Sequence, residues 1–167
     1  ITRGTYTKEG DAVPMSVSDP NFAQLLSEKM GAESFVNYGT NGISYSATAP
    51  INAEYALINV CGKVQGDVIV VAAGTNDYGG NVEIGTYSDR EDVSFCGAVR
   101  RTLETLKENN PSALIVVLLP INRKDEEDRN EKGYHLDQYR WVLDYIAREC
   151  GCMVVDGRKL LFTPDDE

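Results

Sequence analysis

A carboxamide side chain stands at a point of this sequence where chemistry is expected. Residues 74–77 read Gly-Thr-Asn-Asp and directly follow the apolar run Asp67–Ala73. A run without polar alternation predicts a parallel strand buried on both faces, and ligands of open α/β sheets gather at the carboxyl ends of such strands. A neutral amide in a glycine-containing turn can hydrogen-bond a developing negative charge. We therefore interpret Asn76 as an oxyanion-hole side chain, with capping of the turn as the alternative.

The elements around this turn predict a parallel α/β sheet. Strands that alternate with helices place helices on both faces of such a sheet, and right-handed crossovers bring all strand ends to one edge. A second glycine-rich turn, Gly39–Gly42, then shares that edge with residues 74–77, which predicts a common site. Helices are expected at 19–30, 52–61 (weakly), 93–109 and 136–150, and strands at 34–38, 67–73, 113–119 and 153–156.

These two turns, in this order, resemble two of the four sequence blocks of the SGNH (GDSL-type) hydrolase family. Residues 37–42, Asn-Tyr-Gly-Thr-Asn-Gly, match the Asn-x-Gly-x-x-Gly block, and residues 74–77 match Gly-x-Asn-Asp. The resemblance implies a single flavodoxin-like, three-layer α/β/α domain over residues 1–167. It also implies a Ser-His-Asp esterase whose oxyanion hole takes a backbone N–H from Gly39 and the side chain of Asn76.

The two ends of the chain resemble parts of the remaining blocks. Residues 1–4 look like the tail of the Gly-Asp-Ser block, and residues 163–167 look like the approach to the final Asp-x-x-His block. We therefore expect a domain truncated at both ends, with the nucleophilic serine and its strand upstream and the histidine downstream. Asp166 is then the carboxylate that orients the histidine, or Asp165 if the histidine directly follows Glu167.

Composition and charge narrow the classes of partner and cofactor. The chain has 167 residues, 42% of them hydrophobic, and a net charge of −10, which predicts one soluble domain without a nucleic-acid or anionic-membrane partner. No phosphate loop or Gly-x-Gly-x-x-Gly fingerprint follows a strand, so no cofactor is expected. The four cysteines are interpreted as structural thiols, with a disulfide or metal role as the alternative. The compartment, cytoplasmic or secreted, and the oligomeric state stay open.

Several polar and aromatic residues allow two readings. Tyr45 and Tyr78, near the glycine turns, could bind substrate or pack in the core. Asp77 is expected to brace its turn through backbone N–H groups, with a chemical role as the alternative. His135 is expected at the start of a helix or on the surface, with substrate contact as the alternative. The charged loop Asn122–Lys132 is expected to be solvated, with substrate contact as the alternative.

The resemblance implies hydrolysis of small O-acyl esters, with carbohydrate O-acetyl groups as the leading substrate class. A lysophospholipase-like or thioesterase activity is the alternative within the family. The alternative from another class is a non-catalytic SGNH-like or flavodoxin-like binding module, in which the serine and histidine blocks are absent.

Overall fold

A computed structural model describes residues 5–6, 16–17, 21–50 and 53–159. The chain forms two compact units, one up to Asn41 and the other from Gly42 onward, and each is described by itself. In the described ranges, no helix combines the length and apolar character needed to cross a membrane.

The first unit contains a short antiparallel pair and one helix. Strands β1 (Thr5–Tyr6) and β2 (Ser16–Val17) pair with each other. Helix α1 (Phe22–Met30) begins at Asn21, whose side chain accepts hydrogen bonds from two backbone N–H groups of the first turn. The predicted start at Asp19 was therefore two residues early, because Asn21 satisfies the free N–H groups instead. The predicted stop is confirmed, since Gly31 takes the left-handed conformation (φ 66°) that ends helices.

The strand predicted over residues 34–38 is wrong. No strand is assigned there, and three of its large side chains are exposed: Phe35, Val36 and Tyr38. A strand needs a hydrogen-bonded neighbour, whereas the Asn37 side chain accepts a hydrogen bond from the backbone two residues later. This segment has turn chemistry instead of strand pairing.

The second unit is built on a three-stranded parallel sheet of order β3-β4-β5. The strands are β3 (Val68–Ala72), β4 (Leu114–Leu118) and β5 (Met153–Val155). Their register pairs Val70 with Val116 and Val117 with Val154. All three predicted strands are confirmed, and their carboxyl ends share one edge of the sheet.

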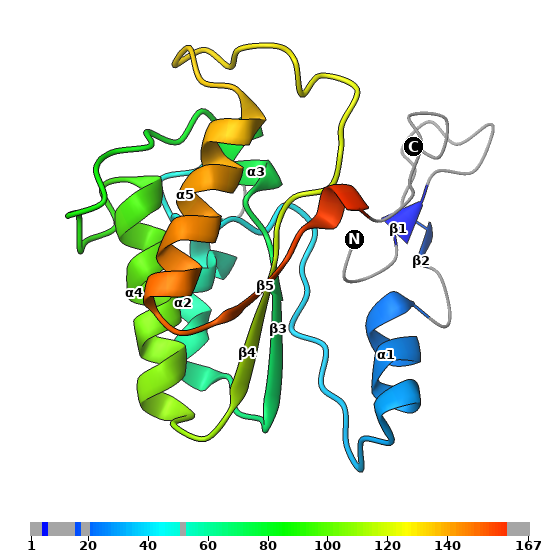
Figure 1. Ribbon diagram of the computed structural model, residues 1–167. Coiled ribbons are helices and arrows are strands. Elements are labelled where there is room, and N and C mark those ends of the chain that lie inside the picture. The colour runs from blue at the N-terminus through cyan, green and yellow to red at the C-terminus, as the bar shows by residue number, and fades with distance from the viewer. Residues whose placement is uncertain (1–4, 7–15, 18–20, 51–52, 160–167) are drawn as a thin grey trace. The chain divides into compact units, whose positions relative to one another are not determined.

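Helices α2 (Leu57–Val60), α4 (Phe95–Asn109) and α5 (Leu136–Glu149) lie together on one face of the sheet (Figure 1). The predicted long helices are confirmed, and the weak helix at 52–61 is divided into a 3₁₀ turn and a single α-helical turn. The bounds are η1 (Ala53–Tyr55), α2 (Leu57–Val60), η2 (Cys61–Lys63), α3 (Thr75–Gly79), α4 (Phe95–Asn109), α5 (Leu136–Glu149) and η3 (Gly157–Lys159).

The core lies between these helices and the sheet. Inward residues of β3 and β4 alternate with half-buried ones, so within the described residues the strands are buried on one face and not, as predicted, on both. Helices α4 and α5 contribute side chains with no exposed surface, which exclude water from this face. The central core residues are Ile69, Val71, Phe95, Val99, Leu103, Ile115, Val117, Leu136, Leu143 and Ile146.

Candidate active site

The candidate site begins where β3 ends. Gly74 has φ 108° and turns the chain directly from the strand into α3. An L side chain rarely adopts this conformation, and a Cβ on Gly74 would also lie 3.3 Å from Pro120 Cγ. The turn places Asn76 in the first turn of α3, at the carboxyl edge of the sheet.

The Asn76 carboxamide is held by a distant part of the chain. Its Nδ2 donates a hydrogen bond of 2.8 Å to the Ile43 carbonyl oxygen. A primary amide carries two N–H donors in one plane, so the second N–H points away from Ile43 while this bond is in place. Such an arrangement can present a neutral donor to an anionic oxygen.

Asp77, the next residue, is fully buried and holds the same segment. Its carboxylate accepts from the Tyr45 N–H at 2.9 and 3.1 Å and from the Ser46 N–H at 3.0 Å. Burial, reinforced by the nearby charge of Asp92, raises the pKa of Asp77 to about 7, against the opposing effect of these N–H bonds. The prediction that Asp77 accepts from backbone N–H groups is confirmed. The expectation that it braces its own turn is corrected, because these N–H groups belong to Tyr45 and Ser46, more than 30 residues earlier in the chain.

A second carboxylate, Asp92, completes the support of this segment. Asp92 accepts from the Ser46 hydroxyl at 2.5 Å and from the Ala47 N–H at 2.9 Å. Residues 43–47, which we call the 43–47 segment, are therefore fixed by Asn76, Asp77 and Asp92 together. Sequence reasoning missed Asp92 because it lies in an irregular loop without a motif or periodicity.

The two tyrosines predicted as substrate-binding residues are packing residues in the described structure. Tyr45 has no exposed surface, and its ring lies edge-on to Phe95 at 5.8 Å between centroids. Tyr78 is 3% exposed, and its hydroxyl donates to the backbone carbonyls of Asp125 (2.8 Å) and Asp128 (3.1 Å). The geometry corrects the prediction toward its packing alternative, because a buried ring offers no face to a ligand.

The charged loop Asn122–Lys132 is tethered as well as solvated. The Tyr78 hydroxyl contacts two backbone carbonyls of this loop. In addition, Asn130 Nδ2 of the loop donates to the Tyr78 carbonyl oxygen at 3.1 Å. The buried Arg140 guanidinium also bonds Glu126 at 2.8 Å. The loop is therefore fixed beside α3, while substrate contact by it stays a prediction.

Gly39 belongs to the first unit and is described by itself. Its N–H donates to Asn37 Oδ1 at 2.8 Å, an exposed two-residue contact. An oxyanion would have to replace Asn37 as the acceptor of this N–H. The role of Gly39 stays a prediction, and Asp165 and Asp166 lie outside the described residues.

His135 stands at the N-cap of α5, which confirms its predicted place at a helix start. The Gln138 side chain accepts from the His135 N–H at 2.9 Å, as in a capping box. This contact uses the backbone of His135, so it places the residue at the helix end without assigning a role to its imidazole.

The four cysteines are unpaired, and burial raises the pKa values of Cys96 and Cys150 to about 11. Both therefore stay protonated at neutral pH and act as packing groups. Among the described residues, no group of three or more His, Cys, Asp or Glu side chains could hold a metal ion.

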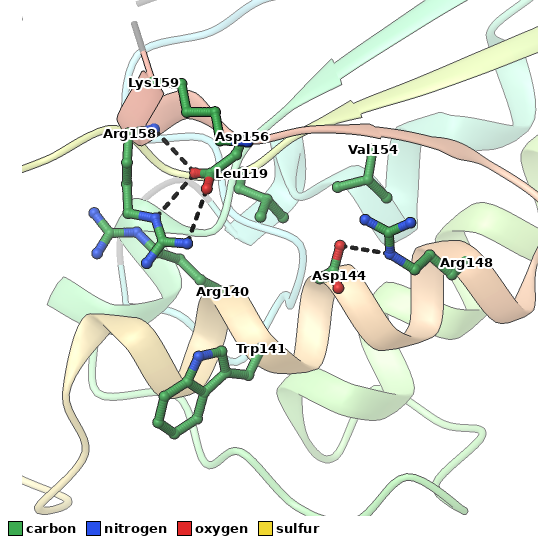
Figure 2. A pocket seen from close by; sticks show the side chains of 9 residues that line it. All are labelled: Leu119, Arg140, Trp141, Asp144, Arg148, Val154, Asp156, Arg158 and Lys159. Atoms are coloured by element: carbon green, nitrogen blue, oxygen red, sulfur yellow. Dashed lines mark hydrogen bonds and ion pairs between the residues drawn. The ribbon is translucent and has the colours of Figure 1, made fainter. Parts of the chain in front are cut away.

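A separate hollow of about 270 Å³ lies between α5 and the segment after β5 (Figure 2). Its charged side chains largely satisfy one another: Arg158 pairs with Asp156 at 2.9 Å, and Arg148 pairs with Asp144 at 2.8 Å. Exposed pairs of this kind contribute little stability, and Asn76 and Asp77 do not line the hollow. Its lining residues are Leu119, Arg140, Trp141, Asp144, Arg148, Val154, Asp156, Arg158 and Lys159.

Comparison with known proteins identifies the family. The sequence profile described as the GDSL-like Lipase/Acylhydrolase family matches residues 1–167, so the chain belongs to this family. The assignment supports an ester-hydrolysing function. A comparison with curated proteins found no match.

Solved structures share the fold. One superposes with a TM-score of 0.79 at 19% identity, covering 95% of this chain and 74% of its own. A protein from Lactobacillus plantarum gives a TM-score of 0.74 at 20% identity, with coverages of 88% and 75%. A possible lipase from Chitinophaga pinensis gives 0.63 at 21%, with coverages of 82% and 58%. These likenesses confirm the predicted α/β fold class.

Proposed function

We propose that the complete protein is a serine esterase that hydrolyses small O-acyl esters through an acyl-enzyme. A serine hydroxyl attacks the ester carbonyl, a histidine removes the hydroxyl proton, and the alcohol leaves after the histidine returns that proton to it. Water then hydrolyses the acyl-enzyme by the same steps. Serine and histidine are assigned to the blocks expected before Ile1 and after Glu167, with Asp166 orienting the histidine.

The observation that carries this proposal is the fixed carboxamide of Asn76. It lies at the carboxyl end of β3 and donates one N–H to the Ile43 carbonyl oxygen. The other N–H is thereby oriented before substrate arrives, which is how a donor stabilises a transition state without reorganisation. Gly39 is proposed as the backbone donor on the strength of its motif.

The substrate proposed is a short acyl ester of a polar alcohol, such as an O-acetylated sugar. The burial of Tyr45 and Tyr78 removes the aromatic argument for sugar contact, so the assay must decide. Turnover of acetylated sugars, lysophospholipids and acyl thioesters by the complete protein separates the alternatives. Absence of turnover of all three, together with no labelling by a fluorophosphonate, would identify a binding module.

The test of the site is Asn76→Ala in the complete protein with p-nitrophenyl acetate. Loss of one oxyanion donor should reduce kcat by about 100-fold, with KM little changed. Asn59→Ala is a matched control, since Asn59 Nδ2 also donates to a backbone carbonyl, that of Ala53, at 2.9 Å. We expect unchanged kcat for the control, and an unchanged kcat for Asn76→Ala would exclude Asn76 from the site.

A further inference from the structure

The 43–47 segment is hydrogen-bonded at its two ends to different parts of the chain. At one end, the Ile43 carbonyl accepts from the Asn76 carboxamide. At the other, Ser46 and Ala47 donate to the Asp92 carboxylate. Ser46 has no exposed surface, so its bond to Asp92 is sheltered from water at this end.

We propose that Asp92 is a positioning residue of the esterase site, which fixes the 43–47 segment so that the Ile43 carbonyl orients the Asn76 carboxamide. This inference rests on the proposed function, since it assigns a supporting residue to the same oxyanion donor. Asp92 acts through the backbone and touches no reacting atom.

Asp77 and Asp92 hold the 43–47 segment from different parts of the chain. Asn76 and Asp77 are adjacent residues of α3, so both hold the segment from the same short helix. Asp92 lies in the loop before α4, two residues before Ser94, the N-cap of that helix. Through Asp92 the segment is therefore connected to the start of α4, a long helix whose residues Phe95, Val99 and Leu103 are fully buried.

The electrostatics also distinguish Asp92 from a packing residue. Its charge acts unfavourably on the buried Asp77 carboxylate, whose pKa it raises. Two carboxylates at one short segment repel each other. Their hydrogen bonds to three successive residues, Tyr45, Ser46 and Ala47, offset this repulsion and define the path of the backbone.

The first test compares Asp92→Ala with Asp92→Asn. The alanine variant loses both bonds, and the resulting shift of the carboxamide should reduce kcat by about 10- to 100-fold, with KM little changed. In the asparagine variant Oδ1 can accept from the Ala47 N–H, while Nδ2 donates to the Ser46 hydroxyl, which can reverse its role. We therefore expect rescue to within a few-fold of wild type.

The measurement is kcat per active site, with sites counted by stoichiometric fluorophosphonate labelling. A residue that only stabilised the fold would lower the number of sites and leave kcat per site unchanged. Asp89→Ala is the matched control, because Asp89 bonds Thr86 and Ser94 in the same loop and does not contact the 43–47 segment. Should Asp92→Ala not fold, Ser46→Ala removes the hydroxyl contact with Asp92 and leaves the Ala47 N–H contact, and it should slow turnover several-fold.

Combination with Asn76→Ala separates this inference from the proposed function. If Asp92 acts through Asn76, Asp92→Ala should cause little further loss in the Asn76→Ala background. A normal kcat per site for Asp92→Ala, or a full additional loss in the double variant, would overturn the role of Asp92 alone. A normal kcat for Asn76→Ala, or no esterase turnover by the wild type, would overturn both.

Discussion

The buried carboxyl of Asp77 gives the protein a pH-dependent stability that can be worked out from the structure. The ordinary pKa of this group is 3.8, and burial raises its pKa to about 7 in the folded chain. Between these values the folded state binds more protons than the unfolded state. The free energy of unfolding contributed by Asp77 is therefore fully present below about pH 4 and is lost as the pH rises to about 7.

The magnitude follows from the two pKa values. The gap between 3.8 and about 7 corresponds to about 4 kcal/mol, at about 1.4 kcal/mol for each pH unit. Other carboxylates act in the opposite direction: hydrogen bonds from Arg123 and Arg158 lower the pKa values of Asp125 and Asp156. The contribution of Asp77 must therefore be measured as a difference from a variant that cannot titrate at this position.

Asp77→Asn is that variant. Its Oδ1 can accept from the Tyr45 and Ser46 N–H groups, but its NH₂ replaces Oδ2, which lies 2.9 Å from Tyr45 N. Two facing donors should cost about 1–3 kcal/mol at every pH. Superimposed on this constant loss, the advantage of the wild type over the variant should shrink by about 4 kcal/mol between pH 4 and pH 8.

The assay is urea denaturation of both proteins, followed by circular dichroism at intervals from pH 4 to pH 8. A difference in unfolding free energy that is constant across this range would refute the raised pKa. A difference that grows with pH would show that the backbone N–H groups outweigh burial and hold the carboxylate in its charged form.

The packing predicts two further outcomes, each measured as a change in the free energy of unfolding. Gly97→Ala would place Cβ 1.9 Å from the Glu91 carbonyl oxygen, and it should lower the free energy of unfolding by about 1–3 kcal/mol or more. The control is Gly62→Ala, where a Cβ would have nothing within 4 Å and stability should change by less than about 0.5 kcal/mol. Equal losses in the two variants would contradict the Gly97 contact. Ile115→Ala removes a fully buried side chain of β4 and should lower the free energy of unfolding by about 2–5 kcal/mol. Leu114→Ala, at the half-exposed neighbouring position, should cost much less. A comparable loss in both variants would show that the faces of β4 are misassigned.

The strands and long helices of the second unit were predictable because their signals are local. The runs at 67–73 and 113–119 are apolar throughout, and the spacing of Val99, Leu103 and Leu106 identifies the buried face of α4. The segment at 34–38 has the composition of a strand, but strand formation depends on a partner that local sequence does not specify. Burial of one face in place of two was likewise a property of the neighbours and not of the run.

The candidate site was predictable only in part, for the same reason. The sequence placed Asn76 and Asp77 at the end of β3 because Gly74 and the preceding run define that turn. It could not assign Tyr45 and Tyr78 between substrate and core, since an aromatic side chain suits both. Asp92 was not predictable, because its partners Ser46 and Ala47 are more than 40 residues away and no pattern relates them.

The contacts of the 43–47 segment show that Asn76 and Asp77 have complementary hydrogen-bonding roles. Asn76 donates to the carbonyl of Ile43, and Asp77 accepts from the N–H groups of Tyr45 and Ser46. A donor and an acceptor on adjacent residues thus fit the alternating polarity of one backbone segment, and two carboxamides or two carboxylates could not do so equally well. It follows that the orientation of Asn76 depends on the path of a segment outside both motifs. Backbone changes at residues 43–47 should therefore affect turnover even where they leave Asn76 itself unaltered.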